Sequence, residues 1–115
     1  MNKILIIDDE IDITESISAI LTDDGFYCCS ASNSEEAIAF LSNELFDLII
    51  LDVWLNDPDY DGIKLLKLIK KKKIKTPVII ISGHGNIEMA VDAIKEGAYE
   101  FIEKPFKSER LTLSV

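Results

Sequence analysis

Short apolar runs alternate with stretches of helical periodicity along this chain. The runs are rich in β-branched residues and are mostly bounded by Gly, Pro, Asp or Ser, which is typical of short strands. Between the runs, apolar residues recur at intervals of three and four, which predicts amphipathic helices with one face on a core. The runs predict five strands, over residues 3–7, 27–31, 48–51, 78–81 and 99–102.

Four helices are predicted between these strands. They are marked by apolar positions at helical spacing, namely Ile13, Ile17, Ile20 and Leu21; Ile38, Leu41 and Leu45; Ile63, Leu66 and Ile69; and Ile87, Ala90, Val91 and Ile94. Gly25 and Gly97 suit the positions just after the first and fourth helices. A last helix begins at Ser108 or Glu109, and the sequence stops at Val115, about two turns later. Either the segment was cut from a longer chain or this helix is unusually short.

The predicted helix ends carry capping signals. Residues 32–34 supply N-cap candidates for the second helix, with Glu35 and Glu36 placed for a capping box and for the helix dipole. Asn86 suits the N-cap of the fourth helix. Lysines at residues 70–73 end the third helix, where they complement the dipole, and we interpret them as a solvated helix end rather than a binding patch.

The run over residues 48–51 is apolar at every position, which is typical of a strand covered on both faces in a parallel sheet. Together with the alternation of strands and helices, it predicts a doubly wound α/β fold with right-handed crossovers. The 115 residues suit one domain, and the connections are too short for another.

Composition and charge narrow the class of protein. Hydrophobic residues make up 48% and charged residues 29%, as in ordinary globular proteins. The apolar runs are too short for a membrane span or a secretory leader, so we interpret the protein as cytoplasmic. Its net charge of −9 disfavours DNA and anionic lipid as direct partners. Cys28 and Cys29 are adjacent, which indicates reduced thiols rather than a disulfide or a zinc site.

Polar side chains follow four of the five predicted strands. Asp8 and Asp9 follow the first, Asp52 the third, Ser82 the fourth, and Lys104 comes just after the fifth. Because the carboxyl ends of parallel strands meet at one edge of the sheet, these groups should converge there. This convergence predicts a functional site at that edge.

Three carboxylates at one edge repel each other. At about 4 Å each pair costs roughly 1 kcal/mol in water and about 4 kcal/mol at an effective dielectric constant of 20. A divalent cation offsets this repulsion, and a few hard oxygen ligands suit Mg²⁺ that keeps several waters. Asp52 then becomes a candidate nucleophile toward a phosphoryl group, with Lys104 as its positive charge and Ser82 as a hydroxyl donor. The alternative is structural: Asp8 and Asp9 cap the first helix and Lys104 pairs with one of them.

The chain resembles the receiver domain of two-component response regulators. The matching motifs are Asp8-Asp9-Glu10, Asp52 after the third strand, Asp61-Gly62, Ser82-Gly83, Gly97-Ala98 and Lys104-Pro105-Phe106. They span nearly the whole chain in order. The resemblance implies a flavodoxin-like (βα)5 fold, with a doubly wound parallel five-stranded sheet of order 2-1-3-4-5 and a truncated last helix.

The resemblance also implies roles for individual residues. Asp52 is similar to the family's phospho-acceptor, and Asp9 to its main Mg²⁺ ligand, with Asp8 acting largely through bound water. The backbone carbonyl of Trp54 completes the implied ligand set.

Three further positions match residues of the family's domain that respond to phosphorylation. Ser82 matches a hydroxyl that moves toward the phosphoryl group, and Lys104 matches a lysine that contacts it and precedes a cis proline. Phe101 stands at the family's aromatic switch position, although it could equally be a plain core residue.

A finer likeness is to the NtrX branch of NtrC-type regulators. It rests on residues 51–55, 82–88 and 97–106, and on a loop after Asp52 that is two residues longer than is usual among receivers. This likeness implies that residues 1–115 are the N-terminal part of a longer transcriptional regulator. Such proteins carry an ATPase module and a helix-turn-helix domain further along the chain.

The resemblance implies a signalling role rather than an enzyme with a substrate of its own. A histidine kinase would phosphorylate Asp52 with Mg²⁺ bound, and the domain would promote only its own phosphorylation and dephosphorylation. Ser82 and Lys104 would then be drawn inward, and Phe101 would turn into the space that Ser82 leaves. The mixed charges on the face of the fourth helix, fifth strand and fifth helix suit a homodimer.

Two alternatives from other classes stay open. A Mg²⁺-dependent phosphohydrolase with an aspartyl intermediate usually has its nucleophile in a D-x-D motif after the first strand, whereas this chain has adjacent Asp8 and Asp9. An unphosphorylated interaction module would usually lack Asp9, Asp52 or Lys104. A flavin-binding module is disfavoured because no phosphate-binding loop follows the first strand.

Overall fold

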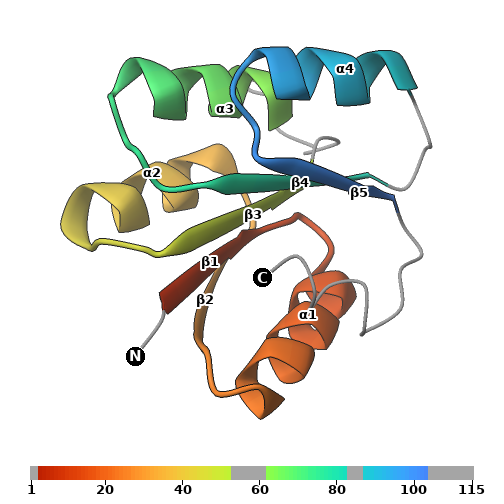
Figure 1. Cartoon of the computed structure of the whole chain (residues 1–115). Coiled ribbons are helices and arrows are strands. Elements are labelled where there is room, and N and C mark those ends of the chain that lie inside the picture. Colours follow the sequence, from red (N-terminus) through yellow and green to blue (C-terminus); the bar gives the residue numbers. More distant parts are fainter. Residues whose placement is uncertain (1–2, 53–61, 83–86, 104–115) are drawn as a thin grey trace.

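The structure is a computed structural model that describes residues 3–52, 62–82 and 87–103 (Figure 1). Strands and helices alternate through these ranges, as the hydrophobic pattern predicts. In chain order they are β1 (Lys3–Ile7), α1 (Ile11–Asp23), β2 (Tyr27–Ala31), α2 (Ser34–Asn43), β3 (Leu48–Asp52), α3 (Gly62–Lys71), β4 (Val78–Ser82), α4 (Ile87–Lys95) and β5 (Glu100–Glu103). The predicted last helix, the Asn86 cap and the cis bond before Pro105 lie outside the described residues.

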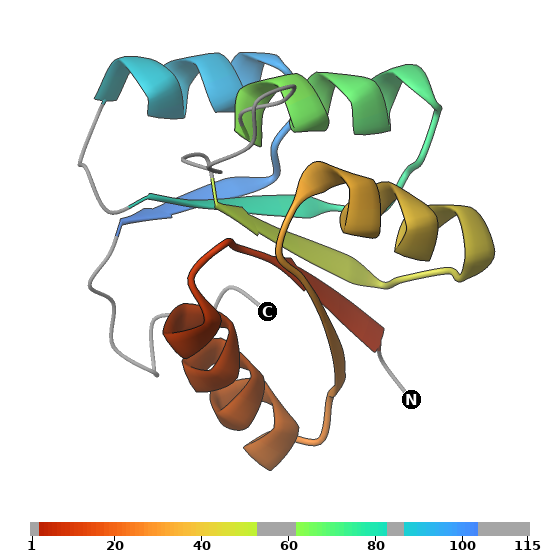
Figure 2. The same cartoon turned by 180° about the vertical axis from the view of Figure 1, so that it is seen from behind.

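The strands form one parallel sheet in the order β2-β1-β3-β4-β5, which confirms the predicted topology. Helix α1 lies on one face of the sheet, and α2, α3 and α4 lie on the other (Figures 1 and 2). Among the described residues, no helix is both long enough and apolar enough to cross a membrane.

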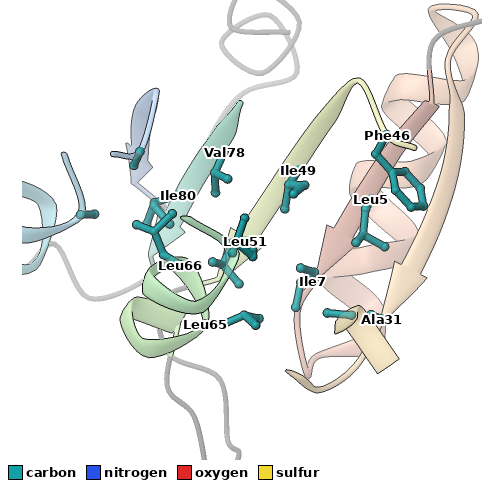
Figure 3. Packing of buried hydrophobic residues seen from close by; sticks show 14 residues of the cluster. Leu5, Ile7, Ala31, Phe46, Ile49, Leu51, Leu65, Leu66, Val78 and Ile80 are labelled. Atoms are coloured by element: carbon teal, nitrogen blue, oxygen red, sulfur yellow. The ribbon is translucent and has the colours of Figure 1, made fainter. Parts of the chain in front are cut away.

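Both faces of the central strands are buried, which explains their continuous apolar runs. Leu5, Ile49 and Ile80 belong to the cluster beneath α2, α3 and α4, whereas Ile4 and Ile50 belong to the cluster beneath α1. Figure 3 shows Leu65 and Leu66 of α3 packed close to Leu51 and Ile80. Because successive side chains of a strand point to opposite faces, each run supplies residues to both clusters.

Three helices end in the same hydrogen-bonded turn, with one residue in the left-handed region. Gly25 after α1 and Gly97 after α4 have φ angles of 91° and 104°, as expected for glycine after a helix. After α3 the residue in this conformation is Lys73, with a φ of 61°. The Lys73 amide donates to the Lys70 carbonyl at 3.0 Å, and the Ile74 amide donates to the Ile69 carbonyl at 3.3 Å.

Four strand boundaries differ from the predictions by one residue. β3 includes Asp52 and β4 includes Ser82, because the ladders continue past the apolar runs: Asp52 pairs with Ile81, and Ser82 pairs with Glu103. β5 begins at Glu100 rather than Tyr99 and ends at Glu103 rather than Ile102.

The N-cap of α2 is Asn33, one of the predicted candidates. Its side-chain oxygen accepts from the Glu36 amide at 2.9 Å. The Glu36 carboxylate accepts from the backbone N–H and the hydroxyl of Ser32, both at 2.7 Å, instead of from the N-cap amide that a capping box uses.

Candidate functional site

The sheet brings Asp8 and Asp52 together at its carboxyl edge. β1 and β3 are neighbours, and Ile7 pairs with Leu51 across them. Asp8 and Asp52 each come one residue after this pair, so their backbones lie side by side. Asp8 is anchored on its other side, because its amide donates to the Ala31 carbonyl of β2 at 3.1 Å.

Four carboxylates gather at this edge. One oxygen from each of Asp8, Asp9, Glu10 and Asp52 can be chosen so that all four lie within 4.8 Å of one another. The prediction had Asp8, Asp9 and Asp52 as ligands and gave Glu10 no role. Its place directly after two aspartates at a strand end was the available signal. We refer to these four residues as the acidic cluster.

Burial within the acidic cluster is graded. Asp8 and Asp52 are 1% and 2% exposed, Asp9 is half-buried and Glu10 is exposed. A buried carboxylate is costly unless polar groups surround it. The Glu10 amide supplies one such group, since it donates to Asp8 Oδ1 at 2.9 Å. The acidic cluster therefore has an inner pair, Asp8 and Asp52, and an outer pair, Asp9 and Glu10, nearer the solvent.

Helix capping does not account for Asp8. The N-cap of α1 is Glu10, whose carbonyl accepts from the amides of Ile13 and Thr14 and whose side chain makes no capping hydrogen bond. The bond to Asp8 comes from the N-cap residue itself, before the helix begins. The N-cap position of α1 is thus Glu10 and not Asp8.

The acidic cluster fits a hard divalent cation. Two ligand oxygens on opposite sides of a Mg²⁺ ion are about 4.2 Å apart, since each Mg²⁺–O bond is about 2.1 Å. A set of oxygens within 4.8 Å needs only small side-chain shifts to meet this geometry. Carboxylate oxygens are also the ligand type that Mg²⁺ prefers. The outer pair, half-buried Asp9 and exposed Glu10, leaves room for water in the remaining positions.

The other predicted site residues divide into two groups. Ser82 is the last residue of β4, one position beyond Ile81, which pairs with Asp52. The fold thus brings the Ser82 backbone to the same edge. Trp54 and Lys104 lie outside the described residues, and Lys104 directly follows the end of β5.

Phe101 lies in β5 and pairs with Ile80 of β4, two positions before Ser82. Its side chain is half-buried and packs against the cluster beneath α2, α3 and α4. Phe101 is thus neither a fully buried core residue nor a free surface residue.

The chain matches known proteins over nearly its whole length. Residues 4–115 match the family model described as the response regulator receiver domain. The nitrogen assimilation regulatory protein NtrX of Azorhizobium caulinodans is 48% identical over 112 residues, which cover 97% of this chain and 25% of that protein. The chain thus spans about a quarter of the length of this relative.

Two solved structures resemble this chain in both sequence and fold. The receiver domain of NtrX from Brucella abortus has a TM-score of 0.92 and 47% identity, over 96% of this chain and 92% of that one. The beryllofluoride-activated NtrC4 receiver domain dimer has a TM-score of 0.91 and 45% identity, over 99% of this chain and 93% of that one.

Proposed function

The chain belongs to the response regulator receiver domain family, and from this premise we propose that Asp52 accepts a phosphoryl group from a histidine kinase. The supporting observation is the position of Asp52: it is buried beside Asp8 at the carboxyl edge of the sheet, within a cluster that fits a divalent cation. An Asp52 oxygen attacks the phosphorus atom, and the bond to the donor's histidine nitrogen breaks. The nitrogen keeps the electron pair and takes up a proton.

The proposed cofactor is Mg²⁺, held by Asp8, Asp9 and Asp52 with the backbone carbonyl of Trp54. The ion supplies positive charge that neutralises the phosphoryl oxygens during the transfer. Asp8 and Asp9 hold it next to the nucleophile. Glu10 is the exposed member of the acidic cluster.

The proposed response involves Ser82, Lys104 and Phe101. The phosphoryl group on Asp52 adds negative charge at an edge that already holds several carboxylates. Lys104 contributes a positive charge to it and Ser82 a hydroxyl hydrogen bond. Movement of Ser82 then opens space toward which the half-buried Phe101 can turn, because the two residues are two positions apart across β4 and β5.

The proposed output is a change in the face formed by α4, β5 and the segment after β5. Val91, Ile94 and Tyr99 are 46%, 48% and 68% exposed there, so apolar side chains are available for a homodimer. We place the chain at the N-terminus of a longer cytoplasmic transcriptional regulator whose other domains bind DNA. The domain promotes only its own phosphorylation and dephosphorylation.

Intact-mass spectrometry after incubation with acetyl phosphate and Mg²⁺ tests the proposal. We expect one phosphoryl group per chain, lost on hydroxylamine treatment and absent in Asp52→Asn. Asp92→Asn is the matched control, because Asp92 is exposed on α4. Stable labelling of Asp52→Asn would overturn the assignment. Continuous release of phosphate from excess phosphoesters would favour the phosphohydrolase instead.

A further inference from the structure

Positive charge is concentrated in one short segment of this acidic chain. Residues 64–75 contain seven of the twelve basic residues and no Asp or Glu. Of these lysines, Lys71, Lys72, Lys73 and Lys75 are all exposed at the end of α3 and just beyond it. We refer to these four residues as the lysine patch.

The helix dipole accounts for only part of the lysine patch. Lys70 and Lys71 lie in the last turn of α3, where a positive charge is favourable. Lys72, Lys73 and Lys75 lie beyond the helix. Lys73 also takes the left-handed conformation that glycine takes after α1 and α4. A lysine at this position costs stability, so its charge is better explained by binding than by folding.

An apolar groove lies between α2 and α3, beside the lysine patch. Its volume is about 300 Å³. Its lining includes Ile38, Leu41, Leu68, Ile69, Ile74 and Lys72. Ile38, Leu41, Leu68 and Ile74 are only half-buried, although they are aliphatic. We call this space the α2–α3 groove, and it has room for one or two apolar side chains.

An exposed leucine lies in the segment after α2, beyond the helix on whose apolar face the sequence pattern predicts it. Leu45 has 93% of its surface exposed. The next residue, Phe46, accepts a hydrogen bond through its carbonyl from the Thr76 hydroxyl at 3.0 Å. This bond holds the segment after α2 against the segment after α3, so that Leu45 and Lys75 belong to neighbouring segments. Apolar and basic groups are therefore next to each other over both helix ends.

We propose that the α2–α3 groove and the lysine patch form a docking surface for an acidic amphipathic helix of another protein. The apolar side chains of such a helix fill the α2–α3 groove and contact Leu45, and its carboxylates meet the lysine patch. Nucleic acid offers phosphates but no aliphatic side chain for the groove. A symmetric pair of copies of this chain would place the lysine patch against itself, which charge repulsion opposes.

The docking surface lies away from the acidic cluster. Asp52 is at the carboxyl end of β3, whereas the C-terminal ends of α2 and α3 lie at the edge where β3 and β4 begin (Figure 1). A partner held there does not cover the edge of the sheet at which Asp52 lies. Docking would therefore be compatible with exchange of the phosphoryl group, and it would not require phosphorylation.

Fluorescence anisotropy with a synthetic peptide tests this proposal. The probe is a labelled helical peptide of about 16 residues, with Leu at i, i+3, i+4 and i+7 and Glu elsewhere. We expect saturable binding of the peptide. The double variant Lys71→Glu and Lys72→Glu should weaken it roughly tenfold, because two attractive charges become repulsive. Leu45→Ser should weaken it several-fold, because an apolar contact is lost. Lys95→Glu on α4 is the matched control and should bind as the unmodified chain does. Amide NMR shifts should map to α2 and α3.

Four results would overturn the proposal. The first is equal binding of a peptide of the same composition with its leucines scattered around the helix. The second is equal weakening by Lys95→Glu, which would indicate unspecific charge attraction. The third is tighter binding to a DNA duplex or to phosphatidylserine vesicles with the same dependence on Lys71 and Lys72. The fourth is self-association in sedimentation that Lys72→Glu abolishes, which would assign the surface to a second copy of the chain.

Discussion

Asp8 and Asp52 are neighbours across two adjacent strands, each one residue beyond the paired Ile7 and Leu51. Both side chains are almost completely buried. The register pairs Ile4 with Leu48 and Ile7 with Leu51, and the apolar side chains of both strands are buried in the core. The packing of the core therefore places two carboxylates together that would otherwise repel each other.

This arrangement predicts opposite effects of one substitution with and without metal. Without divalent ions, the free energy of unfolding of Asp52→Asn should exceed that of the unmodified chain by about 1 kcal/mol. The reason is that the substitution removes one of several carboxylate charges that repel each other. With Mg²⁺ at about 100 times its Kd, the unmodified chain should gain about 2.7 kcal/mol, and Asp52→Asn much less. Thermal and urea unfolding with EDTA or Mg²⁺ measures both effects.

Glu10→Gln is the control for this prediction. Glu10 belongs to the acidic cluster but is exposed, so its substitution should keep most of the Mg²⁺ response. Asp8→Asn should behave like Asp52→Asn. An Asp52→Asn protein that is less stable without metal, or that gains as much from Mg²⁺ as the unmodified chain, would contradict the assignment.

The sequence predicts the sheet well because its strands are short, apolar and separated by clear helical spacing. The pattern predicts Asp52 and Ser82 just after their strands, because a polar residue ends an apolar run, whereas backbone pairing continues for one more residue. Hydropathy does not report this extra step. The pattern predicts Tyr99 in the last strand, but Tyr99 is 68% exposed and the strand begins at Glu100.

The candidate site was predictable where it depends on strand ends and was missed where it depends on tertiary packing. Asp8, Asp9 and Asp52 follow from the parallel topology. Glu10 joins them through the turn into α1, and its only signal in the sequence is its place directly after two aspartates at a strand end. The α2–α3 groove was also missed, since it depends on how closely two helices pack.

Core and surface leucines should differ strongly in their contribution to stability. Leu5 is completely buried, whereas Leu45 is 93% exposed. Leu5→Ala should lower the free energy of unfolding by about 3 kcal/mol, because it leaves a cavity in a packed core. Leu45→Ala should change it by less than about 0.5 kcal/mol. Urea unfolding measures both, and a large loss in Leu45→Ala would show that Leu45 is buried in the folded chain.

The start of α2 should contribute a small pH-dependent stability. The backbone hydrogen bond from Ser32 lowers the pKa of the Glu36 carboxyl below its ordinary value of 4.5. This stability is present above the unfolded pKa and is lost as the pH falls through the lowered folded pKa. The free energy of unfolding of the unmodified chain should exceed that of Glu36→Gln by at most about 0.5 kcal/mol near pH 7, because the site is exposed and screened.

The difference between these two proteins should shrink as the pH falls from about 5 to about 3. Asn33→Ala removes the neutral N-cap instead, so it should cost about 1 kcal/mol at every pH in that range. Urea unfolding at several pH values separates the two effects. A cost of Glu36→Gln that grows on acidification would contradict the sign of the pKa shift.

Lys73 provides a test in which stability and binding should change in opposite directions. Lys73→Gly should raise the free energy of unfolding by about 0.5–1 kcal/mol, because glycine adopts the left-handed conformation without strain. Gly97→Ala should lower it, since the new Cβ atom would stand 3.0 Å from Lys70 Cε at a φ of 104°. If the lysine patch binds an acidic helix, Lys73→Gly should also weaken peptide binding several-fold. A variant that is more stable and binds the peptide equally well would mean that Lys73 is only a poor helix end, and that the docking contacts lie on Lys71, Lys72 and Lys75.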